Sequence, residues 1–184
     1  MIRAFVAIRP PEDASDLLED LGGDLDTGTP VRLENLHLTL AFLGTHDRHV
    51  LEDVAAELDR IRLPAPTVAC LGVGWFGRRR PRSAHALVTP DPALSALASA
   101  VLRAADAAGI APERRKFLPH LTVARFSRDA PSDPDDLARW GAEHAAFQIT
   151  PFAPRAFSLL RSDLTRSGPI YSEAQRYALA DPAG

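Results

Sequence analysis

The sequence predicts an α+β domain built from two related lobes. Segments with strand character alternate with amphipathic helical segments along the whole chain. A short pattern, His-Leu-Thr followed by an aliphatic residue, occurs at 37–40 and again at 120–123. Each copy follows a helix and a polar turn, so two equivalent strands would meet about a pseudo-twofold axis, with helices covering their outer faces.

The first half alternates two strands with two helices. Residues 2–8 predict a strand, and residues 10–23 predict a helix that begins with prolines and ends at a glycine pair. Residues 36–44 predict the strand that carries the first His-Thr pair. The leucines and valines of residues 47–62 have helical spacing, and Pro64 follows this helix.

The second half begins with a predicted hairpin and a long helix. The hairpin joins residues 66–76 to residues 83–88 through an arginine-rich loop. The long helix covers residues 91–109, with Asp91 as its N-cap and Gly109 as its stop. The remaining elements are a strand at 120–126, a short helix at 132–144, and two strands at 152–161 and 170–179. Residues 128–136 are rich in Asp, Pro and Ser, and we expect a mobile loop there.

Length and composition are those of an ordinary globular chain. With 184 residues the chain can bury a real core, and we expect one domain over residues 1–184. No apolar run approaches membrane-spanning length, and the first strand meets acidic residues and prolines too soon for a signal peptide. Cys70, the only cysteine, excludes an internal disulfide and a cysteine-based zinc site. We therefore expect a monomer in the reducing cytoplasm.

The charge distribution gives no strong signal for a nucleic-acid partner. The formal net charge is −3, so the chain has no global basic field. Two basic clusters, GRRRPR at 77–82 and ERRKF at 113–117, can attract a polyanion, although such a run is more often a solvated loop.

The two His-Thr pairs are the candidate functional residues of this sequence. Side chains alternate along a strand, so His and Thr of each copy share one face and the aliphatic residues point to the other. One such pair would be ordinary in a strand. Burying one unpaired polar group costs roughly 1–3 kcal/mol of stability. A second His-Thr pair on the same face of its strand would therefore not stabilise a core, and we expect the two pairs to serve a chemical function.

Three kinds of chemistry compete for these residues. A metal site lacks a carboxylate or thiol at a recognised spacing, and His85 and His144 have no companions, so we expect no metal and no cofactor. Nucleophilic catalysis by a threonine would leave the imidazole without an orienting carboxylate and would need only one copy. Two imidazoles facing across a cleft, one as general acid and one as general base at a single phosphorus, fit best. The threonine hydroxyls would then donate to the non-bridging oxygens of a strained cyclic phosphodiester.

Four segments carry a family resemblance: RAFVAIRPPED, ENLHLTLAFLG, PERRKFLPHLTVARF and GPIYSEAQRYAL. They resemble the 2H phosphoesterase superfamily, named for two H-x-[T/S]-x motifs, and within it the bacterial RNA 2′,3′-cyclic phosphodiesterases, historically called 2′-5′ RNA ligases. The resemblance implies a two-lobed fold whose two antiparallel sheets line a central cleft. It also implies His37 as proton donor to the leaving oxygen and His120 as proton acceptor from water. Thr39 and Thr122 become phosphate ligands.

Three positions near the motifs need comment. Arg125 follows the second motif as in the family and is a further phosphate-binding candidate, yet strand alternation puts it on the opposite face from His120 unless the strand ends or bulges there. Phe42 has the equivalent place after the first motif, and we expect it in the core. His85 stands where relatives commonly carry a tryptophan, a difference that bears on contacts to the nucleobase.

The resemblance implies a metal-independent phosphodiesterase that opens 2′,3′-cyclic phosphates at RNA ends, leaving 2′-phosphates. Its partners would be RNA ends or nucleotides that carry this group, and the reverse reaction would join RNA ends through a 2′-5′ linkage. Three alternatives stay open at this point. They are an esterase for a small cyclic nucleotide, a non-catalytic module that binds RNA ends, and a structural protein with core histidines.

Overall fold

The computed structural model describes residues 1–77, 80–111, 116–165 and 168–181. Its elements follow in chain order: β1 (Ile2–Ile8), α1 (Glu12–Gly23), β2 (Thr29–Pro30), η1 (Leu33–Asn35), β3 (Leu38–His46), α2 (Arg48–Leu58), β4 (Cys70–Phe76), β5 (Ser83–Val88), α3 (Pro92–Ala107), β6 (His120–Arg125), α4 (Pro134–Glu143), β7 (Ala156–Thr165) and β8 (Gly168–Ala178). The expected α+β class is confirmed, and every expected helix and strand is present. The two-residue strand β2 and the single turn η1 were not expected.

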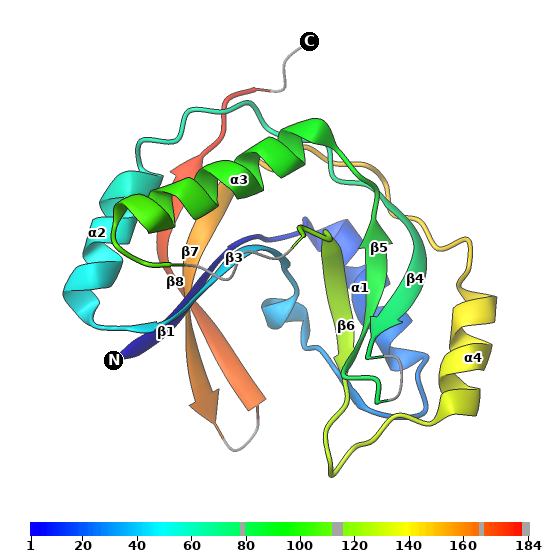
Figure 1. The fold of residues 1–184 in the computed structure, drawn as a ribbon. Coiled ribbons are helices and arrows are strands. Elements are labelled where there is room, and N and C mark those ends of the chain that lie inside the picture. The colour runs from blue at the N-terminus through cyan, green and yellow to red at the C-terminus, as the bar shows by residue number, and fades with distance from the viewer. Residues whose placement is uncertain (78–79, 112–115, 166–167, 182–184) are drawn as a thin grey trace.

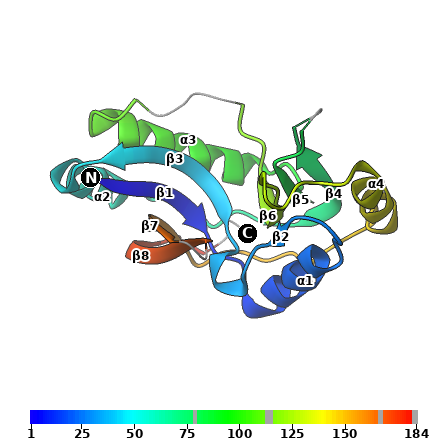
Figure 2. The ribbon, with the colours of Figure 1, turned by 90° about the horizontal axis from the view of Figure 1, so that it is seen from below.

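The strands form one antiparallel sheet in the order β4-β5-β6-β3-β1-β7-β8, with β2 paired to β6. A single residue pair, Leu38 with Leu121, joins β3 to β6. The sheet therefore consists of two halves that meet at this one pair. The two sheets expected from the sequence are thus joined into one. Figure 1 shows the half formed by β1, β3, β7 and β8 beside the half formed by β4, β5 and β6, and Figure 2 shows β6 and β2 at their junction.

One face of the sheet is apolar and is covered by helices. Helix α3 packs on β3 and against α2, and α1 packs on β6 and β5. The core between them includes fully buried residues from each half of the sheet, among them Val6, Leu38 and Leu121, and Val101 from α3. The helices thus cover one face, and the side chains of His37, Thr39 and their counterparts belong to the other. Within the described residues, no helix is long and apolar enough to cross a membrane.

Local signals explain where the helices begin and end. Asp91 caps α3, and its carboxylate accepts the N–H of Leu94 at 2.6 Å. Helix α2 ends at Leu58, four residues before the predicted end at residue 62. The N–H groups of Arg60 and Ile61 bond three residues back, to Glu57 and Leu58, so the chain tightens into a turn ahead of the coming proline.

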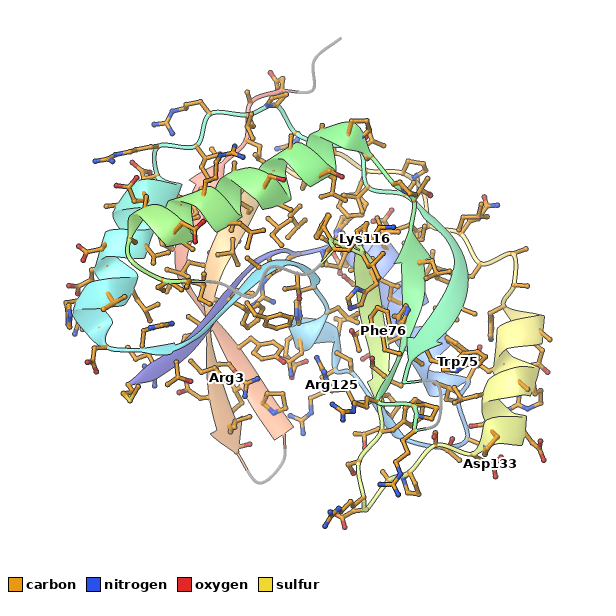
Figure 3. The ribbon with its side chains drawn as sticks, viewed as in Figure 1. Arg3, Trp75, Phe76, Lys116, Arg125 and Asp133 are labelled. Carbon is orange, nitrogen blue, oxygen red and sulfur yellow. The ribbon has the colours of Figure 1, made fainter. Side chains whose placement is uncertain are left out.

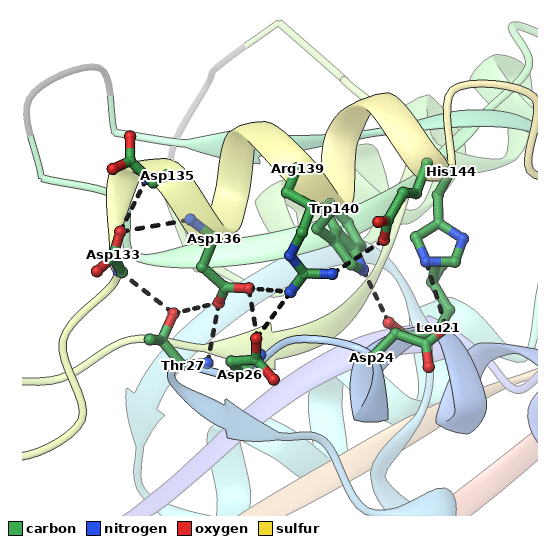
Figure 4. Close-up of polar contacts among 11 residues, drawn as sticks. Leu21, Asp24, Asp26, Thr27, Asp133, Asp135, Asp136, Arg139, Trp140 and His144 are labelled. Atoms are coloured by element: carbon green, nitrogen blue, oxygen red, sulfur yellow. Dashed lines mark hydrogen bonds and ion pairs between the residues drawn. The ribbon is translucent and has the colours of Figure 1, made fainter.

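Helix α4 is tied to the first half of the chain by buried polar contacts (Figure 4). The carboxylate of Asp133 caps the helix and accepts the N–H of Asp135 at 2.8 Å. Asp136 is 8% exposed, and its carboxylate accepts the N–H and the hydroxyl of Thr27 at 2.9 and 2.7 Å. Burial raises the pKa of Asp136, but its hydrogen bonds from Thr27, Asp26 and Arg139 outweigh this and hold the pKa below its ordinary value.

The expected loop at 128–136 is therefore wrong in its last three residues, which belong to the first turn of α4. Acidic residues and proline are typical of a loop, but they are equally typical of a capped helix start. Both basic clusters fall partly outside the described residues: the first loses Arg78 and Arg79, and the second loses residues 113–115.

Candidate active site

Each of the two motif strands contains a β-bulge that its sequence does not predict. In β3, Thr39 pairs with Ala7 and Ala41 pairs with Val6, so Leu40 is an extra residue. In β6, Thr122 pairs with His85 and Ala124 with Ala84, so Val123 is the extra residue. Each strand therefore has a β-bulge immediately after its motif threonine, and the burial pattern over the five residues 38–42 is the same as over 121–125.

The bulges decide the positions of Arg125 and Phe42. One extra residue reverses the alternation, so Arg125 returns to the face of His120 and Thr122 (Figure 3), which is the condition on which its candidacy depended. Phe42 returns in the same way to the face of His37 and is 60% exposed, so its expected place in the core was wrong.

The register across the junction brings the two motifs together. Because Leu38 pairs with Leu121, the residues that flank these leucines, His37 and Thr39 in one strand and His120 and Thr122 in the other, lie at the junction of the two halves. All four side chains point away from the helix-covered face, since both leucines are buried in the core. The two imidazoles are near enough for the charge of His120 to contribute to the lowering of the pKa of His37.

Each motif histidine is held by the same hydrogen bond. Nδ1 of His37 lies 2.6 Å from the carbonyl oxygen of Asn35, and Nδ1 of His120 lies 2.7 Å from that of Leu118. A carbonyl can only accept, so Nδ1 carries the proton in both rings. In the neutral ring Nε2 is then the basic nitrogen, and no described residue bonds to it. Both histidines therefore present an available Nε2.

The surroundings of His37 are aromatic and dry. The residue is 7% exposed, and its ring lies 4.8 Å from the ring of Phe5 and meets Tyr171 edge-on at 5.2 Å. Burial lowers the pKa of His37 to about 4, against the opposing effect of the Asn35 carbonyl. The positive charges of Arg125 and Arg9 add to the lowering.

His120 has a matching environment in the other half. Phe76 meets its ring edge-on at 4.8 Å, and the His85 ring lies 5.0 Å away. Burial lowers the pKa of His120; the Leu118 carbonyl opposes this, and the charge of Arg125 contributes to the lowering. Burial also lowers the pKa of His85 to about 4.

Two expectations about the other histidines were wrong. His85 was expected to have no companion, but its ring lies 4.3 Å from the ring of Phe76 in a tilted arrangement and 5.0 Å from that of His120. His144 also has a partner: its Nε2 lies 3.2 Å from the carboxylate of Asp24, at the C-terminal end of α4 (Figure 4). Among the residues that the structure describes, no three His, Cys, Asp or Glu side chains are grouped as metal ligands would be.

Comparison with known proteins identifies the family of the chain. The family model of the LigT-like phosphoesterases matches residues 8–85 and 88–171, which is most of the chain. The chain belongs to this family. A Thermus thermophilus protein named RNA 2′,3′-cyclic phosphodiesterase is 33% identical over 196 aligned positions, covering 100% of this chain and 93% of the relative. A Geobacillus stearothermophilus protein of the same name is 30% identical over 153 residues, covering 79% of this chain but only 49% of its own length.

Solved LigT-like structures have the same fold. The crystal structure of TT0787 of Thermus thermophilus superposes with a TM-score of 0.79 at 27% identity, covering 98% of this chain and 99% of that one. The structure of Escherichia coli LigT complexed with 3′-AMP gives a TM-score of 0.71 at 25% identity and 97% coverage of both chains.

Several residues of this LigT-like site have no signal in their own segments. Phe5 comes from β1, Phe76 from β4 and Tyr171 from β8, and each reaches a motif histidine only through the order of strands in the sheet. The sequence could have indicated Tyr171 only through its place in the closing segment, which resembles the family.

Proposed function

We propose that this LigT-like phosphoesterase hydrolyses the 2′,3′-cyclic phosphate at RNA ends, or on nucleotides, to a 2′-phosphate without a metal ion. We propose further that it acts as a single-domain monomer in the cytoplasm. The observation that carries the proposal is the matched pair of imidazoles, each with Nδ1 held by a carbonyl and Nε2 available. The shared name of the Thermus and Geobacillus relatives, RNA 2′,3′-cyclic phosphodiesterase, supports the choice of substrate.

The reaction needs two proton transfers on opposite sides of the phosphorus. His120 Nε2 takes a proton from a water molecule, and the water oxygen bonds to phosphorus as the P–O3′ bond breaks. His37 Nε2 gives its proton to the departing O3′. In-line displacement requires water and leaving oxygen to lie opposite each other, so one histidine must stand on each side. The two motifs belong to different halves of the sheet, on either side of the junction between β3 and β6, and this supports the assignment.

The phosphate needs ligands that do not react. The hydroxyls of Thr39 and Thr122 donate to the two non-bridging oxygens, where charge is stabilised in the transition state. Arg125, exposed on the same face, adds a guanidinium whose charge already acts on both imidazoles. Its bidentate donors suit a phosphate better than a single ammonium would.

The low pKa of His37 results first from the burial of its ring. As a general acid His37 must be protonated, and in the free protein burial opposes this. A phosphodiester carries one negative charge, and an opposite charge within about 4–6 Å favours the protonated imidazole. Substrate binding therefore charges His37 at the moment when the proton is needed.

The test is a reaction with a short RNA that ends in a 2′,3′-cyclic phosphate, with a chelator present, and phosphorus NMR of the product. We expect a 2′-phosphate. His37→Ala and His120→Ala should each lose most of the activity, roughly 10²–10⁴-fold for one proton transfer, and the double variant should lose little more. His49→Ala, an exposed histidine of α2, is the control. An active His120→Ala protein would refute the two-histidine mechanism, and a 3′-phosphate product would refute the assigned orientation.

A further inference from the structure

Asn35, the last residue of η1, joins three parts of the site. Its carbonyl oxygen accepts from Nδ1 of His37 at 2.6 Å. Its side-chain Nδ2 donates to the carbonyl oxygen of Pro169, in β8, at 2.9 Å, and its backbone N–H donates to the carbonyl oxygen of Arg32 at 2.8 Å. The residue is 7% exposed. One buried side chain therefore ties the turn that holds His37 to the last strand of the sheet.

The same strand also supplies an aromatic contact to His37. Tyr171 follows Pro169 by two residues in β8, and its ring meets the imidazole of His37 edge-on at 5.2 Å. Because the amide of Asn35 bonds to Pro169, it connects the carbonyl that holds Nδ1 with the strand that carries the neighbouring ring. The two supports of His37 thus belong to one connected unit.

Stability alone does not explain an amide at this position. The side-chain Oδ1 of Asn35 is buried and has no hydrogen-bond partner in the part of the chain that the structure describes. A buried acceptor without a donor costs stability, and a leucine of similar size would bury no such oxygen. The useful atom of this amide is therefore Nδ2, through its bond to Pro169.

The other motif histidine lacks this second anchor. Nδ1 of His120 is held by the carbonyl oxygen of Leu118 at 2.7 Å. The side chain of a leucine cannot donate a hydrogen bond, and Leu118 is 52% exposed. A change at Asn35 should therefore disturb His37 and leave His120 as it is.

We propose that Asn35 is a positioning residue for His37. Its side chain fixes the carbonyl of residue 35, so that this carbonyl keeps the ring proton on Nδ1 and directs Nε2 toward the leaving oxygen. The proposal rests on the proposed function, in which His37 is the general acid, and adds a residue that acts through it.

The charge of His37 also depends on this carbonyl. Burial and the positive charges of Arg125, Arg9 and His120 all lower the pKa of His37, whereas the hydrogen bond to the Asn35 carbonyl raises it. Loosening this bond should therefore make His37 harder to protonate as well as less well oriented.

The first test is steady-state hydrolysis of adenosine 2′,3′-cyclic phosphate by Asn35→Leu, which removes the donor at similar side-chain volume. We expect kcat to fall at least about tenfold, since a displacement of about 1 Å can cost about 100-fold. KM should stay within about twofold, because the proposed phosphate ligands are unchanged. Asn35→Ala, which adds no bulk, should behave in the same way. Glu34→Gln, in the same turn with a side chain 68% exposed, is the matched control and should match wild type.

The second test is nitrogen-15 NMR of the histidine rings in the free protein, which distinguishes positioning from a general loss of structure. In Asn35→Leu and Asn35→Ala the Nδ1 proton of His37 should exchange with water at least about tenfold faster than in wild type. The pKa of His37 should fall in both variants, and the signals of His120 should not change.

Three outcomes would overturn the assignment. An unchanged kcat in both variants would mean that the amide does not position the acid. A reduced kcat with unchanged His37 signals would mean that Asn35 acts elsewhere, and equal changes at His37 and His120 would indicate a general disturbance. The NMR measurement needs no turnover. A wild-type protein that fails to hydrolyse the cyclic phosphate would therefore reject the proposed function, while the NMR result would still decide whether Asn35 orients His37.

Discussion

His85 should make the protein more stable at neutral pH than at acidic pH, and His85→Phe should remove part of that dependence. The pKa of His85 falls from 6.5 to about 4 on folding because the ring is buried. The unfolded chain therefore takes up a proton first as the pH falls, and stability that is present above pH 6.5 is lost toward pH 4. At pH 4.5 this loss is roughly 2.5 kcal/mol for one histidine. At pH 7.5 the phenylalanine variant should be at least as stable as wild type, since it removes a buried nitrogen without a partner.

The assay is urea unfolding of wild type and His85→Phe at pH 7.5 and pH 4.5, at constant ionic strength, followed by circular dichroism. With a denaturant dependence of about 2 kcal/mol per molar, the variant should gain about 1 M in its urea midpoint relative to wild type at the lower pH. His49→Gln, at an exposed position, controls for the loss of a histidine as such. A difference between wild type and His85→Phe that is the same at both pH values would refute the argument from burial.

Three further results are expected. First, kcat/KM for a cyclic phosphate should peak below pH 6.5 and fall above it, because the pKa values of His37 and His120 are both lowered in the free protein; a maximum above pH 7 would contradict this. Second, Asp136→Asn should cost about 2 kcal/mol of unfolding free energy, and exposed Asp135→Asn almost none; equal losses in urea unfolding would mean that the Thr27 contacts contribute little. Third, Gly22→Ala should destabilise by about 1–3 kcal/mol, because its Cβ would lie 2.5 Å from the carbonyl oxygen of Val123. Gly23→Ala, with nothing within 4 Å, should not, and thermal unfolding of the two variants compares them directly.

Most of the fold could be predicted because its signals are local. Helix α3 begins at a capping aspartate and a proline and ends just before Gly109, whose φ of +80° only glycine adopts readily. The motif strands have an alternating pattern that separates a core face from a cleft face. By contrast, β2 has two residues and η1 has three, too few for any periodicity to be recognised.

The candidate site was predicted less completely, for a physical reason. His37, Thr39, His120 and Thr122 lie at fixed offsets within their own strands, so their common face follows from alternation alone. The positions of Arg125 and Phe42 depend on the bulges at Val123 and Leu40, and both extra residues are ordinary strand formers. Whether a strand bulges is decided by its neighbours in the sheet. The same is true of Phe5, Phe76 and Tyr171, which reach the histidines through strand order.

The matched hydrogen bonds from Nδ1 to the carbonyls of Asn35 and Leu118 determine which ring nitrogens can exchange protons during the reaction. Because Nδ1 is hydrogen-bonded in both rings, every catalytic proton of the proposed mechanism enters and leaves through Nε2. In that mechanism, one hydrolysis ends with His37 neutral and His120 charged, the reverse of their protonation states at the start. That end state is the correct starting state for the reverse reaction, the attack of an O3′ on the phosphorus. A second hydrolysis requires His120 to release its proton and His37 to gain one from solvent. A product that dissociates more slowly than this exchange remains bound to protonation states that favour re-formation of the cyclic phosphate.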